Sequence, residues 1–182
     1  TTFGLKPDIL TSAKALSSGY VPISAVMVNE KVHAAIAANS GKIGTFGHGF
    51  TYSGHPVACA IALETLKVYE DENILAHVKT LVPKFQKALH GYEGRKYVGE
   101  VRGVGLIGAI ELYADPAKRV AFDPAKKAGY RLAELALEQG LIVRAMGDSI
   151  AFCPALITTA AEMDELFARF DRALAIFEET FA

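Results

Sequence analysis

Two apolar segments near the start of the chain show little alternation between polar and apolar positions. Residues 9–13 and 23–28 consist almost entirely of apolar or small side chains. Strands of this composition are typical of a parallel sheet that helices cover on both faces. The pattern therefore predicts two strands buried on both faces, followed by a short helix over residues 31–39.

Apolar residues at helical spacing dominate the next part of the chain. They predict one helix from about residue 56 to 69 and another from about 73 to 90, with a polar break between them. We therefore expect two domains. Residues 1–72 would form a sheet unit that ends in a long helix, and residues 73–182 would form a compact α+β unit.

Short apolar segments in the second part of the chain predict further strands. Residues 97–101 and 106–112 have the composition of two paired strands, and residues 141–144 and 149–153 that of a hairpin. The glycines of residues 103–108 spell GxGxxG, the fingerprint of dinucleotide-binding proteins. That fingerprint requires a following helix, whereas strand formers follow here. We therefore interpret these glycines as a tight turn between two strands.

Capping signals mark two helices in this second part. Asp123 and Pro124 predict an N-cap and a first-turn proline, and Gly140 predicts the end of that helix. Thr159 and Glu162 have the spacing of a capping box ahead of the last helix. Apolar residues then recur at helical spacing and predict a core-facing stripe: Met163, Leu166, Phe167, Phe170, Leu174, Phe177 and Phe181.

Charge and composition exclude several classes of function. The chain of 182 residues carries 19 basic and 20 acidic side chains, for a formal net charge of −1. No basic stripe is present to neutralise phosphates, which argues against a nucleic-acid partner. The apolar runs are shorter than the roughly 18 to 20 residues that a membrane span requires. These features predict a soluble, cytoplasmic enzyme.

The cysteines and histidines do not suggest a disulfide framework or a metal site. We expect Cys59, in a helix, and Cys153, in a strand, to be buried small apolar groups in a reducing compartment. His48 and His55 could pair on a metal ion, but no third ligand lies nearby in the sequence. We therefore expect no metal.

Lys14 is the first candidate for chemistry, because it ends an apolar run and opens a turn of small residues. A crowded strand end would desolvate the ammonium and favour the neutral amine, which is a nucleophile. Schiff-base chemistry with an aldehyde cofactor, above all pyridoxal phosphate, is a common use of such a lysine. The structural alternative is a lysine that extends from a strand end to solvent.

A glycine- and hydroxyl-rich loop over residues 47–56 leads directly into the first long helix. Backbone N–H groups, the hydroxyls of Thr51 and Ser53, and the positive end of the helix could together hold a phosphate. The alternative is a helix N-terminus that Ser53 caps, with a proline in the first turn.

Arg144 is the second charged candidate. It ends a short apolar segment beside a glycine-aspartate turn, where its guanidinium could bind a carboxylate with two hydrogen bonds. The alternative is a salt bridge to Asp148.

Four blocks of this sequence closely resemble those of class III pyridoxal-phosphate aminotransferases. They read KPDILTSAKALSSGYVPISA at residues 6–25, GFTYSGHP at 49–56, VRGVGLI at 101–107 and LIVRAMGD at 141–148, followed by Pro154. The order of the blocks is that of the family, and the chain is most similar to the omega-transaminases, which include amine:pyruvate and beta-alanine:pyruvate enzymes. The resemblance implies the α/β architecture of fold type I. Only the C-terminal half is matched: the end of the large, mostly parallel sheet domain plus a small α+β domain.

The resemblance also implies a reaction and a cofactor, pyridoxal 5'-phosphate. Lys14 would hold it as a Schiff base and then transfer protons. An amino group would pass from an amine or omega-amino acid to a keto acid such as pyruvate in a ping-pong sequence. Phe50 and Thr51 would bind the phosphate of the neighbouring subunit's cofactor, which implies a homodimer with shared sites. Arg144 would recognise the substrate carboxylate and swing aside for amines that lack one.

Length and small departures from the family pattern affect this interpretation. Because a family member is roughly twice as long, we expect these residues alone, without the N-terminal half, to be inactive. Ala15 and Ala155 stand where many members have glycine and proline, which makes fine substrate geometry less predictable than the reaction class. Two alternatives remain: another pyridoxal-phosphate reaction on this scaffold, such as that of an aminomutase or racemase, and a non-catalytic fragment.

Overall fold

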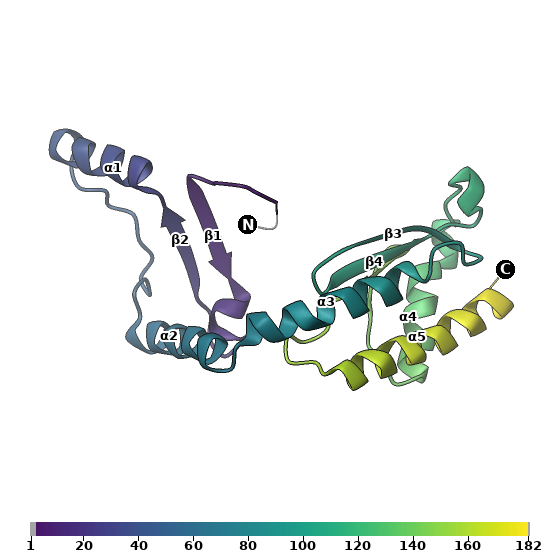
Figure 1. Cartoon of the computed structure of the whole chain (residues 1–182). Coiled ribbons are helices and arrows are strands. Elements are labelled where there is room, and N and C mark those ends of the chain that lie inside the picture. The colour runs from purple at the N-terminus through teal and green to yellow at the C-terminus, as the bar shows by residue number, and fades with distance from the viewer. Residues whose placement is uncertain (1–2, 182) are drawn as a thin grey trace. The chain divides into compact units, whose positions relative to one another are not determined.

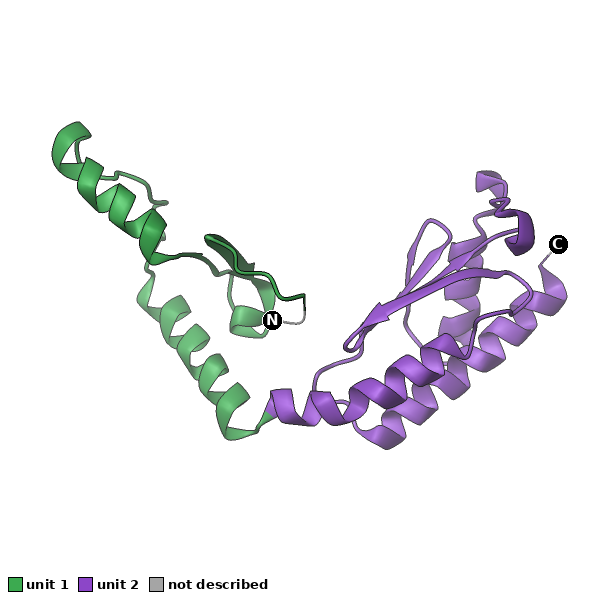
Figure 2. Cartoon of the chain, turned by 45° about the horizontal axis from the view of Figure 1, so that its top comes forward, with its two compact units in different colours: residues 1–73 green, residues 74–182 purple. Residues whose placement is uncertain are grey.

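The computed structural model describes residues 3–181 and divides the chain into two compact units (Figure 2). Unit 1 ends at Asn73, and unit 2 begins at Ile74. The sequence led us to expect a division between residues 72 and 73. The assignment of these units to the large and small domains of a whole enzyme stays a prediction, and each unit is described by itself below.

Unit 1 contains two strands, two long helices and one short helical turn (Figure 1). Its elements are β1 (Ile9–Ala13), the 3-10 turn η1 (Lys14–Ser17), β2 (Ser24–Val28), α1 (Glu30–Ile43) and α2 (Pro56–Asp71). The expected strands and helices are all present, although α1 extends beyond the expected residues 31–39. Within the unit, α2 packs against η1.

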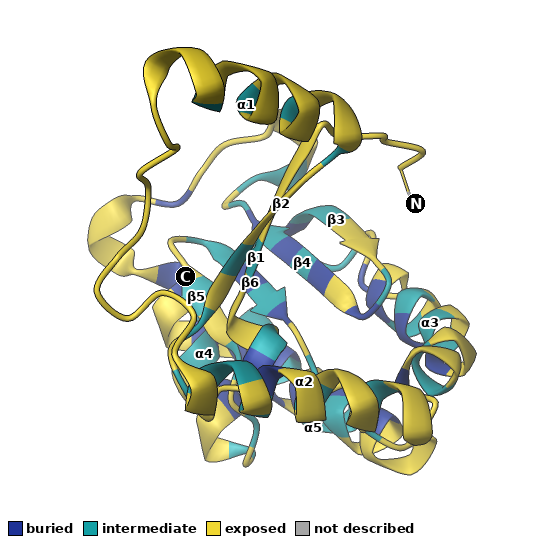
Figure 3. Ribbon diagram, turned by 90° about the vertical axis from the view of Figure 1, so that its left-hand side faces the viewer, coloured by how far each residue is buried: buried dark blue, intermediate teal, exposed yellow. Residues whose placement is uncertain are grey.

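The two strands of unit 1 differ from the expectation in direction and in burial. They pair antiparallel, with Ile9 opposite Val28 and Ala13 opposite Ser24. Most of their side chains are exposed, as is most of α1 (Figure 3). The prediction of strands buried on both faces of a parallel sheet is therefore wrong for this pair. Apolar composition reports a tendency to be buried, but two strands provide too little surface to cover one another.

Unit 2 is an α+β unit with one antiparallel sheet. Its strands are β3 (Val98–Val104), β4 (Ile107–Leu112), β5 (Arg144–Met146) and β6 (Ser149–Phe152), in the spatial order β3-β4-β6-β5. Its helices are α3 (Ile74–His90), α4 (Ala128–Glu138) and α5 (Ala160–Thr180), with the 3-10 turns η2 (Pro116–Lys118) and η3 (Pro124–Lys126). All neighbouring strands run antiparallel.

The core of unit 2 lies between one face of this sheet and the three helices. Phe85 of α3, Leu132 of α4 and Phe170 of α5 belong to one buried cluster with Ile110 of β4 and Ile150 of β6. Each of these five side chains has no exposed surface. Burial of large apolar side chains of this kind contributes about 1.5 to 3 kcal/mol each. The opposite face of the sheet carries charged side chains, which are described with the site.

The last helix confirms the prediction made from its caps and its stripe. The Thr159 hydroxyl accepts a hydrogen bond from the Glu162 N–H, and the Glu162 carboxylate accepts one from the Thr159 N–H. The hydrogen bonds that the Glu162 carboxylate accepts, first from the Thr159 N–H and then from the Thr159 hydroxyl, lower the pKa of Glu162. The predicted stripe faces the core: Met163, Phe167, Phe170, Leu174 and Phe177 are buried, and Leu166 and Phe181 pack against the cluster.

The GxGxxG segment forms a hairpin turn, as we interpreted it. β3 and β4 pair antiparallel with Val104 opposite Ile107, and Gly105 has a φ of +61°, which favours glycine. A strand follows the glycines where a dinucleotide site requires a helix.

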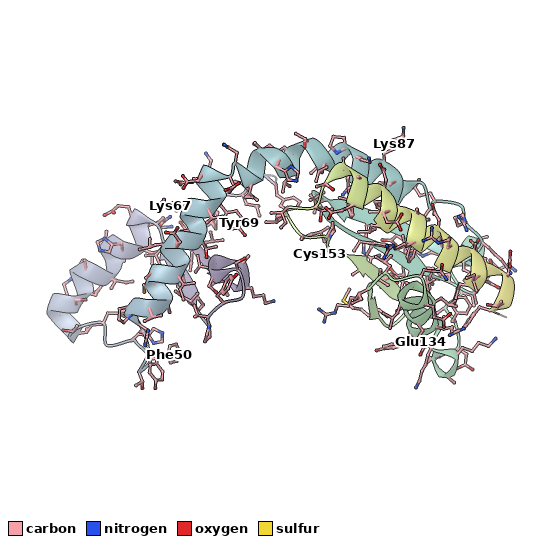
Figure 4. The ribbon with its side chains drawn as sticks, turned by 90° about the horizontal axis from the view of Figure 1, so that it is seen from below. Phe50, Lys67, Tyr69, Lys87, Glu134 and Cys153 are labelled. Carbon is pink, nitrogen blue, oxygen red and sulfur yellow. The ribbon has the colours of Figure 1, made fainter. Side chains whose placement is uncertain are left out.

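Three local predictions need correction. The hairpin strand expected at residues 141–144 is β5, which instead begins at Arg144 and ends at Met146. Asp123 does accept a hydrogen bond from the Ala125 N–H, but Pro124 opens only the short turn η3, and α4 begins at Ala128. Cys153 is exposed and lies beyond the end of β6, in the segment that leads to α5 (Figure 4), so it is not a buried strand residue. Cys59, in α2, is half-buried.

Candidate active site

Lys14 follows β1 directly and has an unusual backbone conformation. It is the first residue of η1, and its φ of 55° lies in the left-handed region that residues other than glycine seldom adopt. Such strained residues cluster at functional sites, where the surrounding structure holds them in place. The backbone geometry therefore sets Lys14 apart from the other lysines of unit 1.

The turn after Lys14 is fixed by Ser17, a polar residue that is almost fully buried. The Ser17 hydroxyl donates to the Val21 carbonyl at 2.6 Å, and the Ser17 carbonyl accepts from the Tyr20 N–H at 3.0 Å. Because a buried hydroxyl requires a partner, these bonds hold the chain in one path. Sequence reasoning missed this role of Ser17, since nothing in the sequence distinguishes it from Ser18.

The loop ahead of α2 does not use Ser53 as a helix cap. The Ser53 hydroxyl instead accepts a hydrogen bond from the Phe50 N–H at 2.8 Å, within the loop. The N-cap residue of α2 is His55, whose side chain makes no capping bond. The predicted Ser53 cap is therefore wrong, whereas the first-turn proline is confirmed, because Pro56 opens α2. The first N–H groups of α2 lack a side-chain partner, and this is the geometry in which helix N-termini bind anions.

Lys14 and Phe50 line the same cavity, which measures about 860 Å³. The polar residues around it include Tyr52, Ser53 and His55, and the start of α2 forms part of its wall. A cavity of this size suits a small-molecule ligand. Thr51 is exposed and lies between two lining residues, but it is not among those that line the cavity. Phe50 projects from the loop that precedes α2 (Figure 4).

The expected desolvation of Lys14 does not occur in this chain. Its side chain is exposed in spite of its place at a strand end. The turn fixes the backbone from which the amine extends, while the open cavity leaves the amine accessible to solvent and to small molecules. The residues of unit 1 therefore account for the position of Lys14 and for its access, but not for a dry environment.

Arg144 lies in unit 2, at the start of the edge strand β5. Its side chain is exposed, and it forms no ion pair with any residue between 3 and 181. The alternative, a salt bridge to Asp148, is wrong, because the Asp148 carboxylate accepts a hydrogen bond from the Gly129 N–H at 3.0 Å. The guanidinium of Arg144 is thus available to a ligand.

The outer face of the sheet places a second arginine in the same cross-strand row. Arg144 is opposite Ala151, Ala151 is opposite Ala109, and Ala109 is opposite Arg102. Arg102 is already paired: its guanidinium donates to Glu111 at 2.7 Å, which raises the pKa of Arg102. Of the two arginines in this row, Arg144 is therefore the one free to bind a carboxylate.

Within the described residues, no group of three His, Cys, Asp or Glu side chains is arranged to hold a metal ion. In the same part of the chain, no helix combines the length and the apolar character needed to cross a membrane.

Comparison with known proteins identifies the family. The model of the class III aminotransferases matches residues 1–174. The chain belongs to this family. Gamma-aminobutyrate transaminase 1 of Oryza sativa subsp. indica, a mitochondrial protein, is 43% identical over 99% of this chain, which covers 35% of that protein. Gamma aminobutyrate transaminase 3 of Solanum lycopersicum, a chloroplastic protein, is 43% identical over 94% of this chain and 33% of that protein.

Solved transaminases share the fold of this family member. A structure described as a transaminase with L-ala superposes with a TM-score of 0.94 at 43% identity, covering 100% of this chain and 43% of the other. The PMP-bound aminotransferase of Vibrio fluvialis gives a TM-score of 0.94 at 36% identity and the same full coverage, with 40% of that chain covered. The fold type I assignment is thereby confirmed. The chain spans about a third of the length of the curated relatives.

Proposed function

We propose that this chain provides the lysine-bearing part of a pyridoxal-phosphate-dependent aminotransferase. The reaction would move an amino group from an amine or omega-amino acid to a keto acid such as pyruvate. One observation supports this proposal most directly: Lys14, with its left-handed backbone at a strand end, lines the same cavity as the uncapped N-terminus of α2. An amine and an anion-binding helix end at one cavity match an aldehyde that also carries a phosphate.

The residues present fit this cofactor. The Nζ of Lys14 would hold its aldehyde. The start of α2 lies at the same cavity, and its first N–H groups have no side-chain cap. When bound, pyridoxal phosphate supplies the electron sink that lets a proton leave the substrate carbon. The resemblance implies that Phe50 and Thr51, in the loop ahead of that helix, would contact the phosphate of the neighbouring subunit's cofactor.

Lys14 would have two successive roles. Its Nζ would hold the cofactor, and the same Nζ, once free, would carry a proton as general base and then as general acid. The exposed position of the side chain allows the amine to leave and return without rearrangement of β1 or η1. Because the donor would give up its amino group and leave as a carbonyl product before the keto acid binds, ping-pong kinetics are expected.

Arg144 would recognise the substrate carboxylate. A guanidinium binds a carboxylate with two parallel hydrogen bonds, and the side chain is exposed and without an ion-pair partner among the described residues. Amines that lack a carboxylate would require the guanidinium to move away from the substrate.

We also propose a homodimer with shared sites. The resemblance motivates this proposal, since it implies that Phe50 and Thr51 serve the partner's cofactor. Thr51 is exposed and lies outside the cavity of its own Lys14, whereas Phe50 lines that cavity. An isologous pair would contain two equivalent sites. We expect a cytoplasmic location. The relatives described above are mitochondrial and chloroplastic, so cell fractionation is the direct test.

Chemical trapping tests the assignment of Lys14. The product of the complete reading frame that encodes these residues, hereafter the complete protein, is purified with its cofactor, reduced with borohydride and digested. We expect a pyridoxyl adduct on the peptide that contains Lys14, together with formation of alanine from pyruvate and an omega-amino acid. An adduct on another lysine, or no adduct at all, would show that the proposed function is wrong.

Replacement of Thr51 by alanine is expected to weaken cofactor retention by about 10- to 100-fold. This range corresponds to the loss of one hydrogen bond to a charged group, about 1.5 to 3 kcal/mol. The measurement is the concentration of pyridoxal phosphate that restores half of the activity to the cofactor-free protein. Thr45→Ala is the matched control, since Thr45 is an exposed residue of the same loop outside the Lys14 cavity. A change in amine preference with unchanged cofactor retention would contradict this role.

A further inference from the structure

The hairpin that carries Arg144 ends in a tight two-residue turn. Met146 of β5 is opposite Ser149 of β6, so only Gly147 and Asp148 connect the two strands. Gly147 has a φ of +62°, a conformation that favours glycine. The position of this turn determines the position of β5, which is only three residues long and begins at Arg144.

The Asp148 side chain ties this turn to the first turn of α4. Its Oδ1 accepts a hydrogen bond from the N–H of Gly129, the second residue of α4, at 3.0 Å. The N-cap residue of α4, Lys127, contributes no side-chain cap. Asp148 therefore caps the helix from 19 residues away, and its negative charge lies at the positive end of the helix.

Gly129 lets the two backbones approach closely. A Cβ atom at this position would lie 2.0 Å from the Gly147 carbonyl oxygen and 2.9 Å from the Asp148 Cα. Both neighbours are backbone atoms of the turn, so they could not move aside without displacing the hairpin. Gly129 is fully enclosed by this packing.

Two further contacts hold the hairpin from its other side. The Asp148 carbonyl accepts a hydrogen bond from the Leu112 N–H at 2.9 Å, at the end of β4. Ile150, the neighbour of Ala145 across the hairpin, is fully buried in the core. The turn is thus held by a helix, by a strand and by the core.

From these contacts we propose that Asp148 is a positioning residue for carboxylate recognition. It fixes the backbone of β5 against α4, so that Arg144 starts from a rigid strand and adapts to different donors by rotation of its side chain alone. The inference rests on the proposed function, because it assumes that Arg144 binds the substrate carboxylate. Removal of the Asp148 side chain would let the turn shift, and a bidentate contact is sensitive to such a shift, whereas an amine without a carboxylate does not use it.

The test compares two donors in the complete, cofactor-loaded protein with pyruvate as acceptor. Beta-alanine carries a carboxylate, and propylamine has a methyl group in its place. In a ping-pong reaction, kcat/KM for the donor reports on the donor half-reaction alone. We expect Asp148→Ala to lower the ratio of kcat/KM for beta-alanine to that for propylamine about tenfold. Asp148→Asn keeps an oxygen acceptor at the same place and should restore most of that ratio.

Control variants separate positioning from general destabilisation. Asp123→Ala removes an aspartate of the same unit that also accepts a hydrogen bond from a backbone N–H, as the N-cap of η3, and should leave the ratio unchanged. If Asp148→Ala does not fold, Asp148→Gln replaces it, because its longer side chain moves the acceptor oxygen away by one carbon. Its donor ratio is then compared with that of Asp148→Asn. The inference is overturned if the Asp148 variants leave the ratio unchanged or lower kcat/KM equally for both donors.

Arg144→Ala distinguishes this inference from the proposed function. If Arg144→Ala lowers the donor ratio and the Asp148 variants do not, only the positioning role fails. If Arg144→Ala leaves the ratio unchanged, the assignment of Arg144 to the carboxylate is wrong, and the positioning role fails with it.

Discussion

Replacement of Lys14 by alanine is expected to reduce amino transfer in the complete protein by at least about a thousandfold. General acid-base catalysis alone contributes about 10²- to 10⁴-fold, and Lys14 would also hold the cofactor through a covalent bond. The measurement is kcat with pyruvate and an omega-amino acid at saturating cofactor. The same variant should lose the adduct that borohydride traps in the unsubstituted protein.

Two further variants make this experiment specific to the amine. Lys14→Arg keeps a positive charge but supplies a guanidinium, which stays protonated and is no nucleophile, so it should be as inactive as Lys14→Ala. Lys42→Ala removes an exposed lysine from the last turn of α1 in the same unit and should retain full activity. Turnover by Lys14→Ala within tenfold of the original rate would contradict the proposed mechanism.

Local sequence signals were sufficient for elements whose stability is decided within the segment. The capping box of Thr159 and Glu162 and the stripe after it fixed both the start and the buried face of α5. The turn between β3 and β4 was predictable because Gly105 adopts a positive φ and strand formers follow it. In these cases the residues that determine the structure lie within a few positions of one another.

Burial in unit 1 could not be predicted in the same way. The apolar composition of β1 and β2 indicated burial on both faces, yet the pair is largely exposed in this chain. Composition shows what a segment prefers, while burial depends on whether other elements cover it. Cys153 is a second example. Its neighbours in the sequence are apolar, but its side chain is exposed in the folded chain.

The candidate site was predictable only in part. Lys14 could be singled out from its place at the end of an apolar run. The cavity that it shares with Phe50 joins segments 36 positions apart, a distance that local patterns do not bridge. The partner of Asp148 could not be predicted. Arg144 was the closest opposite charge in the sequence, but Arg144 lies on the strand and Asp148 in the turn, where the carboxylate meets the N-terminus of α4 instead. That contact depends on the packing of a helix against a hairpin, which local spacing does not encode.

Replacement of Phe170 by alanine is expected to destabilise unit 2 by about 3 to 5 kcal/mol. Phe170 has no exposed surface, and its ring packs edge-on against Tyr92 and Phe152, with centroids 5.3 and 4.8 Å away. The substitution would remove these aromatic contacts and leave a cavity where α5 meets the sheet. Tyr92 is itself buried in this core, and that burial raises the pKa of its hydroxyl.

Hydrogen exchange read by mass spectrometry measures this loss of stability in unit 2, and it does not require the whole protein to unfold in one step. Amides of β6 and α5 in Phe170→Ala should exchange faster by roughly two to four orders of magnitude, because their protection reflects the free energy of opening the core. Glu179→Ala is the control, since Glu179 is exposed on the same helix and its loss should change protection by less than about 0.5 kcal/mol. Equal protection in the two variants would mean that Phe170 does not anchor α5 to the sheet. Peptides of unit 1 should remain unchanged in both variants, because every residue of the buried cluster that contains Phe170 belongs to unit 2.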